Sequence, residues 1–204
     1  MEQITNQVTL RGTLASAPRF SHENHGKRFF RFYLDVPRLS SAVDTLPIVA
    51  PEALLEATPL EEGSLLSVTG QVRSHNLRSD GQRHLLIFVF ATDLALQDGE
   101  SVNQVTLEGF LCREPIFRRT PLGREICDVM LAVPRAFQRS DYLPCILWGR
   151  TAQEVSRCHT RDRLCLTGRL QSRIYTKLTE EGSLQKTAYE ISALTAEVLP
   201  APEQ

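Results

Sequence analysis

Apolar and polar residues alternate along much of the second half of the chain. A period of two is typical of β-strands that bury one face and expose the other. The alternating series are Val105, Leu107, Gly109 and Leu111, followed by similar runs in residues 127–133, 143–147 and 164–170. We expect each of these segments to be a half-buried strand.

The alternation breaks at residues 151–159, where Ala152, Val155 and Cys158 have helical spacing. Residues 51–58 are the matching segment of the first half, and Pro51 suits the first turn of a helix. Each half therefore predicts three strands, a short helix and two further strands.

The two halves are copies of one domain. NQVTLRGTL at residues 6–14 returns as NQVTLEGFL 97 positions later, and the same shift matches Val36-Pro37-Arg38 with Val133-Pro134-Arg135. After one inserted residue, VTGQVRS at 68–74 corresponds to LTGRLQS at 166–172. We place the domains at residues 1–98 and 99–204, with a linker near Asp98-Gly99, which is a turn signal.

Each copy has a glycine inside its first strand, Gly12 or Gly109, and another in its fourth, Gly70 or Gly168. Small barrels need such glycines where long strands bend sharply. The predicted fold is all-β, with two tandem five-stranded OB-fold Greek-key barrels, each with a short helix between strands 3 and 4. A pair of ordinary antiparallel sheets is the alternative.

Composition narrows the functional classes. Formal net charge is −1, but nine basic and twelve acidic side chains fall in residues 1–102, against fourteen and twelve in residues 103–204. The second half is therefore the better candidate for contact with a phosphate backbone. No apolar run approaches the length of a membrane span, and the start lacks a signal-peptide pattern, so we expect a cytoplasmic protein without membrane contact.

Catalytic and metal-site signals are missing from the sequence. There is no Walker loop, dinucleotide fingerprint or HExxH, so we expect no enzyme activity and no cofactor. The five cysteines form no CxxC pair and suit reduced, mostly buried thiols. His22 and His25 have the spacing of a metal pair but lie in a predicted polar loop, and we interpret them as solvated surface.

The second copy resembles the bacterial single-stranded-DNA-binding proteins over almost its whole length. The likeness runs from NQVTLEGFLCREP through LAVPRAF, DYLPCILWGRTAQEV and LTGRLQSRIY to TAYEISA. In the first copy it is confined to NQVTLRGTL, the stretch from Pro18 to Gly26 and VTGQV. The resemblance implies binding of single strands by aromatic rings that stack on bases, beside cations that neutralise phosphates.

The family's stacking positions correspond to Phe137, Tyr142, Trp148 and Tyr175. Neighbouring cations are candidate phosphate-binding residues, although single basic residues are often only solvated surface. They are Arg135, Arg139, Arg150, Arg173 and Lys177, together with Arg118, Arg119 and Arg124 in the predicted loop between the first two strands. Cys145 and Leu147 share one face of their strand and Trp148 lies on the other face. Trp148 therefore points outward if Cys145 and Leu147 point inward.

The first copy departs from the family at all four positions. Ser40, Thr45, Pro51 and Leu77 stand where the aromatics are expected. Instead, Phe29, Arg31 and Tyr33 share the strand face opposite Phe30, Phe32 and Leu34. That face is either a rearranged ligand surface or an interface used in assembly. A sheet that is apolar on both faces more often indicates an interface.

The resemblance also implies partners. Family members with two barrels per chain assemble as dimers, so a homodimer with four OB folds is expected. The family's acidic tail recruits replication or recombination enzymes, and the sequence here ends at LPAPEQ, so we expect that mode of recruitment to be missing.

Sequence-tolerant binding and protection of single-stranded DNA by the second barrel is the leading hypothesis, with possible roles in replication, repair or recombination. A primosome-type protein-interaction scaffold with vestigial DNA binding is the alternative from another class. An RNA-binding OB module is a third possibility, because stacking does not read the 2′-hydroxyl.

Overall fold

The computed structural model describes residues 5–79, 82–179 and 182–200. The first half contains the elements β1 (Asn6–Leu14), β2 (Arg19–Asn24), β3 (Lys27–Pro37), β4 (Val43–Pro51), α1 (Glu52–Ala57), β5 (Leu65–Ser79) and β6 (Gln82–Leu96). The second half repeats them as β7 (Val102–Leu111), β8 (Ile116–Arg119), β9 (Glu125–Arg135), β10 (Arg139–Trp148), α2 (Gly149–Val155), β11 (Arg163–Thr179) and β12 (Gly182–Leu199). The end of the chain, on which the expectation about the acidic tail rests, falls on residues 201–204 and lies outside the described part.

Five strands close into a barrel in each half. In the first, the neighbours run β3, β4, β6, β5 and β1, and β1 returns to β3 through Thr13 opposite Asp35 and Leu14 opposite Leu34. Only β4 and β6 pair in parallel within this barrel. The second barrel closes the same way through β9, β10, β12, β11 and β7. The predicted all-β fold of two tandem OB barrels is confirmed, with the helix between the third and fourth barrel strands.

A sixth strand in each half was not predicted. Both β2 and β8 lie at an edge of the sheet and pair antiparallel with β3 and β9, and all their residues are exposed. Backbone hydrogen bonds and contacts between exposed side chains attach these strands, so no alternation of buried and exposed side chains marks them in the sequence. The prediction of a loop at Arg118 and Arg119 was wrong, because both residues belong to β8.

Aliphatic side chains fill the barrels, and the residues predicted to face inward do so. Leu143, Cys145 and Leu147 are all buried, and so are Phe32 and Leu34 in the first barrel. The helices cover the barrels at their outer ends, where α2 buries Ala152 and Val155. The cores are therefore built from strand positions of one parity, which leaves the other parity for surface chemistry.

The glycines in the fourth strands lie where two backbones approach each other closely. A Cβ on Gly70 would lie 2.1 Å from the Phe90 carbonyl oxygen, and one on Gly168 would lie 2.2 Å from that of Ser192. The register of β5 with β6 and of β11 with β12 shifts at these same glycines. Only a residue without a side chain allows the bulge that bends these long strands.

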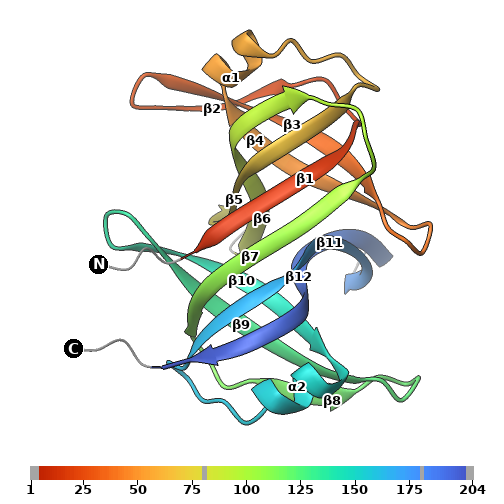
Figure 1. Ribbon diagram of the computed structural model, residues 1–204, viewed down its shortest axis with the longest axis vertical. Helices are drawn as coiled ribbons and strands as arrows, with labels where there is room; N and C mark the ends of the chain where they lie inside the picture. The colour runs from red at the N-terminus through yellow and green to blue at the C-terminus, as the bar shows by residue number, and fades with distance from the viewer. Residues whose placement is uncertain (1–4, 80–81, 180–181, 201–204) are drawn as a thin grey trace.

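The two barrels join through an antiparallel pair between β1 and β7, which lie side by side in the middle of Figure 1. Val8 pairs with Val105, its own counterpart in the repeat, so the contact is symmetric about that point. One sheet of twelve strands therefore runs through the described residues of both barrels. The predicted division at residue 98 falls between the end of β6 at Leu96 and the start of β7 at Val102, and stays our division of the chain.

Two buried carboxylates also connect the barrels. Asp44 accepts hydrogen bonds from Arg38 Nε and Nη2 at 2.7 and 2.5 Å, and from the backbone N and Oγ of Ser172 in the other barrel at 2.6 and 2.9 Å. We call these three residues the first clasp. They are distant in sequence, so only folding brings them together.

The second clasp is the symmetry-related counterpart, centred on Asp141. Its carboxylate accepts a hydrogen bond from the backbone N of Ser74 in the first barrel at 2.7 Å. Arg73 and Arg135 approach the same carboxylate at 3.4 Å each. Each barrel therefore contributes the aspartate of one clasp and the serine of the other. The arginine contacts are longer in the second clasp than in the first.

Candidate nucleic-acid interface

Strand β10 displays two of the four predicted stacking residues on its outer face. Tyr142 is 43% exposed and Trp148 36%, whereas Asp141, Leu143 and Leu147 on the other face are buried. Six residues of strand separate the two rings, which corresponds to about 20 Å. They are spaced for contact with different nucleotides of one strand.

Trp148 is anchored by its polar edge. The indole Nε1 donates a hydrogen bond to Ser192 Oγ on β12 at 3.1 Å, and that serine is buried. A fixed N–H orients the ring while part of it stays in contact with solvent. Ser192 is a site residue that the sequence reasoning missed.

Phe137 lies at the tip of the β9–β10 hairpin and is 93% exposed. It and Gln138 both have positive φ, at 60° and 53°, a backbone region that side chains other than glycine seldom occupy. A tight turn thus holds a large apolar ring in water, where it contributes nothing to the core.

Tyr175 on β11 is 38% exposed, with the Arg173 guanidinium 5.8 Å from its ring centroid. Arg173 Nε also lies 3.7 Å from the carboxylate of Glu190, which accepts a second contact from Gln171 Nε2 at 2.9 Å. Glu190 is a buried acid on the candidate surface, and the sequence reasoning missed it. Arg173 therefore supports Tyr175 and balances Glu190, in addition to any phosphate contact.

The predicted cations divide into paired and unpaired groups. Arg118 binds Asp128 at 2.6 Å, which raises the pKa of its guanidinium, and Arg119 and Arg150 bind Glu125 and Glu154 at 2.8 and 2.9 Å. Arg135 belongs to the second clasp.

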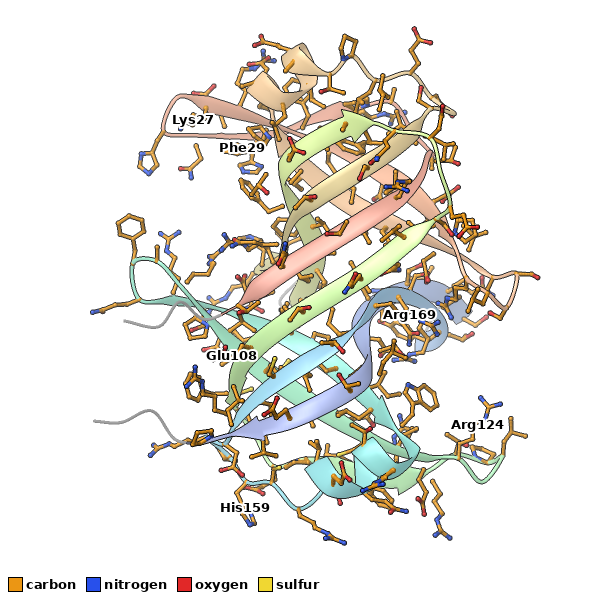
Figure 2. The ribbon with its side chains drawn as sticks, in the orientation of Figure 1. Lys27, Phe29, Glu108, Arg124, His159 and Arg169 are labelled. Atoms are coloured by element: carbon orange, nitrogen blue, oxygen red, sulfur yellow. The ribbon has the colours of Figure 1, made fainter. Side chains whose placement is uncertain are left out.

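Arg139 and Arg124 are exposed and form no ion pair with another described residue. Arg139 adjoins the Phe137 turn, whereas Arg124 lies on the loop between β8 and β9 at the edge of the molecule (Figure 2). The side chain of Lys177 lies outside the described residues. Among the predicted cations that the structure describes, Arg139 thus combines a free charge with a place beside a candidate stacking ring.

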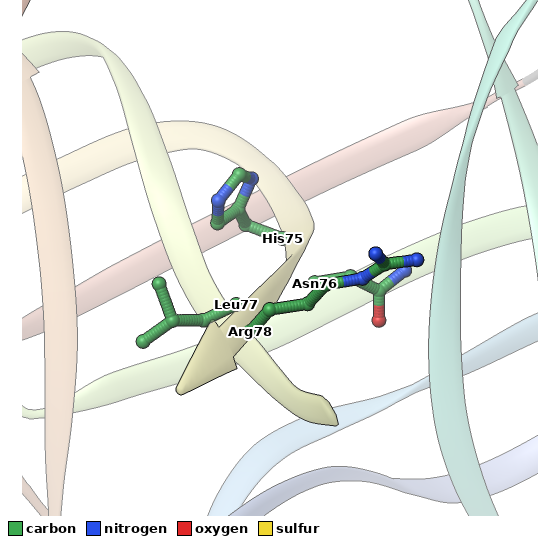
Figure 3. A pocket seen from close by; sticks show the side chains of 4 residues that line it. All are labelled: His75, Asn76, Leu77 and Arg78. Carbon is green, nitrogen blue, oxygen red and sulfur yellow. The ribbon is translucent and has the colours of Figure 1, made fainter. Parts of the chain in front are cut away.

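The first barrel lacks rings at the corresponding places. Leu77, the counterpart of Tyr175, is 43% exposed and lines a hollow of about 470 Å3 on β5 with His75, Asn76 and Arg78 (Figure 3). Ser40 and Thr45 are exposed and offer no ring either.

The three residues predicted as a secondary surface of the first barrel share the outward face of β3 but have different neighbours. Phe29 joins an aromatic group at the base of the β2–β3 hairpin (Figure 2). Tyr33 lies near Tyr189 of the second barrel, whose pKa is raised by burial and also by Tyr33. Arg31 is exposed.

The cysteines have no metal-site geometry in the described part of the chain, where no group of three or more histidine, cysteine or acidic residues lies close enough to hold an ion. Cys127, Cys145 and Cys158 are buried, Cys165 is half-buried and Cys112 is exposed. Burial raises the pKa of Cys127 to about 11 and raises that of Cys145 as well. None of the helices in the described residues has the length and apolarity to cross a membrane.

Comparison with known proteins agrees with this geometry. The model of the single-strand binding protein family matches residues 102–199. Single-stranded DNA-binding protein B of Bacillus subtilis is 37% identical over 87 residues, covering 39% of this chain and 75% of that protein. The single-stranded DNA-binding protein of Bacillus cereus is 33% identical over 104 residues, covering 48% of this chain and 58% of the relative. The chain thus spans about three quarters of the first relative's length and less than two thirds of the second's.

Solved structures extend the similarity to both barrels. The crystal structure of the wild-type single-stranded DNA binding protein from Thermus aquaticus aligns with a TM-score of 0.80 and 25% identity, over 100% of this chain and 97% of that one. A deletion mutant of the same protein aligns with a TM-score of 0.77 and 25% identity over 100% of both chains. The chain therefore belongs to the single-strand binding protein family.

Proposed function

We propose that the second barrel binds single-stranded DNA by stacking bases on Phe137, Tyr142, Trp148 and Tyr175. The observation that carries the proposal is the exposure of all four rings on the outside of a barrel whose core is already filled. Stacking of a base on such a ring contributes about 1–3 kcal/mol. At that rate four rings contribute about 4–12 kcal/mol.

Phosphate contacts come from the cations beside these rings. Arg139 adjoins Phe137 and forms no ion pair with another residue that the structure describes, and Arg150 lies two residues beyond Trp148 in an exposed pair with Glu154. Exposed pairs of this kind are worth little, so a phosphate can replace the carboxylate at small cost. Because every base has a stacking face, this arrangement binds single strands with little sequence preference.

The proposal is tested by removing three rings together in the variant F137A/Y142A/W148A. At the lower limit of about 1 kcal/mol per stacked base, its Kd for fluorescein-labelled oligo-dT rises at least about 100-fold. Fluorescence anisotropy measures the affinity, and circular dichroism checks that the fold is intact.

The matched control is Phe117→Ala. Phe117 on β8 is 40% exposed in the same barrel. It pairs with Cys127 on β9, whose side chain points into the core, so Phe117 lies on the other face of the sheet from the rings. The proposal predicts unchanged affinity for this variant. Unchanged affinity in the folded triple variant contradicts the proposal and favours the protein-interaction scaffold, while preference for oligo-U over oligo-dT favours RNA.

A homodimer with four barrels and a cytoplasmic location stay predictions. Sedimentation equilibrium of the free protein tests the first, with the mass of two chains as the expected result.

A further inference from the structure

The first barrel carries an aromatic group with an arginine on the outside of its sheet. The His22 ring stacks on Phe29 with 4.8 Å between centroids, Phe29 lies 5.9 Å from Phe90, and the Arg73 guanidinium lies 5.8 Å from the Phe90 ring. We call His22, Phe29, Arg73 and Phe90 the first-barrel cluster. Its members come from β2, β3, β5 and β6.

The cluster occupies the same face of its barrel that carries the candidate site in the second. Phe90 alternates with the buried Val89 and Ala91, and its counterpart in the repeat is Ser192, the residue beneath Trp148. Phe29 alternates in the same way with the core residues of β3 and is half-buried. Rings missing from the family's positions are thus replaced by rings on neighbouring strands.

The second clasp links this cluster to the candidate site. The backbone N of Tyr142 donates a hydrogen bond to Ser74 Oγ at 2.8 Å, and Arg73 Nη1 lies 3.4 Å from the Asp141 carboxylate. Arg73 therefore contacts Phe90 of the cluster and the neighbour of a predicted stacking residue at the same time.

The link carries a surplus of positive charge. Arg73 and Arg135 share the single carboxylate of Asp141, each at 3.4 Å. The Arg73 pKa is lowered by burial and by Arg135, although Asp141 acts in the opposite sense. A phosphate at this point would relieve the repulsion between the two guanidinium groups.

Charges of both signs lie near the cluster. Glu52 is paired with Arg28 at 2.5 Å, whereas Asp35 accepts a hydrogen bond from the neutral Thr45 hydroxyl at 2.6 Å, which does not cancel the charge of a carboxylate. Arg31 is exposed on the outward face of β3 and makes no ion pair with another described residue.

We infer that the first-barrel cluster is a second base-stacking surface, which takes the continuation of the single strand bound at Tyr142. The inference rests on the proposed function of the second barrel. Bases extend the stack of His22 on Phe29 and lie against Phe90, and Arg73 and Arg135 hold the phosphate that passes between the barrels. A strand long enough to leave the second barrel engages both surfaces at once.

The test compares two oligo-dT lengths, since one OB fold covers about 4–16 nucleotides. An oligomer of about 8 nucleotides is followed by quenching of Trp148, and one of about 30 nucleotides by anisotropy of an end label. In the variant F29A/F90A, the Kd of the longer oligomer rises at least about 25-fold, from about fivefold per ring at the lower limit. The Kd of the shorter one stays the same.

Two variants control for the substitutions. F29Y/F90Y keeps both rings and retains wild-type affinity. Phe20→Ala removes an exposed ring from the same β2–β3 hairpin, where Phe20 packs on Phe30 outside the cluster, and has no effect. If F29A/F90A does not fold, photocrosslinking of bromodeoxyuridine oligomers to the unaltered chain replaces it, with adducts in β3 or β6 expected for the longer oligomer.

Three results would overturn the inference. One is an unchanged affinity of folded F29A/F90A for the longer oligomer, or no adduct in β3 or β6. Another is a fall in its sedimentation mass from two chains to one, which would show that a second copy covers the cluster. The third is a failure of the shorter oligomer to quench Trp148, which removes the proposed function itself and is recognised separately because it occurs in the unaltered protein.

Discussion

Removal of the Asp44 carboxylate is predicted to weaken the union of the two barrels. The group is fully buried and accepts four hydrogen bonds of 2.5–2.9 Å, two from Arg38 and two from Ser172 of the other barrel. Removing one partner of a buried pair costs about 3–5 kcal/mol. Because the Arg38 side chain is 21% exposed and can be rehydrated, we expect Asp44→Ala to cost about 3 kcal/mol, at the lower limit of that range.

Asp141→Ala is the matched comparison, because it removes the corresponding carboxylate of the second clasp. Only one of its contacts, from the Ser74 backbone N at 2.7 Å, is short, and both arginines are 3.4 Å away. A single good charged hydrogen bond contributes about 1.5–3 kcal/mol, so we expect about 1.5 kcal/mol here.

Thermal unfolding distinguishes the two variants. Trp148 fluorescence reports on the second barrel, since it is the sole tryptophan, and circular dichroism reports on both. Thermal midpoints should fall by about 6–12 °C for Asp44→Ala and about 3–6 °C for Asp141→Ala. Equal losses, or a larger loss for Asp141→Ala, would refute the reasoning that contact geometry sets the strength of each clasp.

Three further predictions concern acid stability, salt dependence and backbone packing. Burial alone would raise the Asp44 pKa, but the hydrogen bonds of the first clasp outweigh it and hold the pKa below 3.8. The stabilisation from Asp44 is therefore complete above that value and is lost as pH falls through the lower folded pKa. Urea midpoints should drop in acid less steeply in Asp44→Asn than in wild type. Arg139→Ala should lower the slope of log Kd against log salt by about 0.7. Arg118→Ala should change this slope less, because a carboxylate at 2.6 Å already neutralises Arg118. Equal slopes in the two variants would contradict this assignment. Gly168→Ala should lower the free energy of urea unfolding by about 2–4 kcal/mol, and Gly109→Ala should lower it by less. The added Cβ would lie 2.2 Å from a carbonyl oxygen in the first variant and 2.8 Å in the second. The reverse order would show that the close approach is not what requires glycine.

The barrels could be predicted because their signals are local or repeated. Alternation of apolar residues marks the strands that line the core, and the duplication confirms each element by its counterpart. Gly70 and Gly168 were predicted as bending points, and both lie at register shifts against a neighbouring backbone. Such positions can be recognised in the sequence because only glycine fits there.

Other features depend on contacts that no local pattern reveals. The strands β2 and β8 bury no side chain, so nothing in their sequence alternates. Asp44 and Asp141 match in the repeat, yet their serine partners lie in the other barrel, far along the chain. The repeat shows that both carboxylates recur but does not show what they bind.

The candidate site was predictable in part. The outward direction of Trp148 follows from strand parity, but its bond to Ser192 and the burial of Glu190 require the packed sheet. Phe90 had a visible signal, since it alternates with Val89 and Ala91 at an outward position of an apolar strand. Besides the family's own positions, the sequence reasoning considered only Phe29, Arg31 and Tyr33 in the first barrel, and therefore passed over Phe90.

Trp148 reports directly on the proposed stacking of single-stranded DNA bases on the outer face of the second barrel. The most direct measurement is a titration of the unaltered protein with oligo-dT, followed by tryptophan fluorescence at several salt concentrations beside a matched duplex. We expect strong quenching by the single strand, weakening as salt rises, and much weaker binding of the duplex. Unquenched fluorescence with no retardation of the single strand at low salt would contradict it.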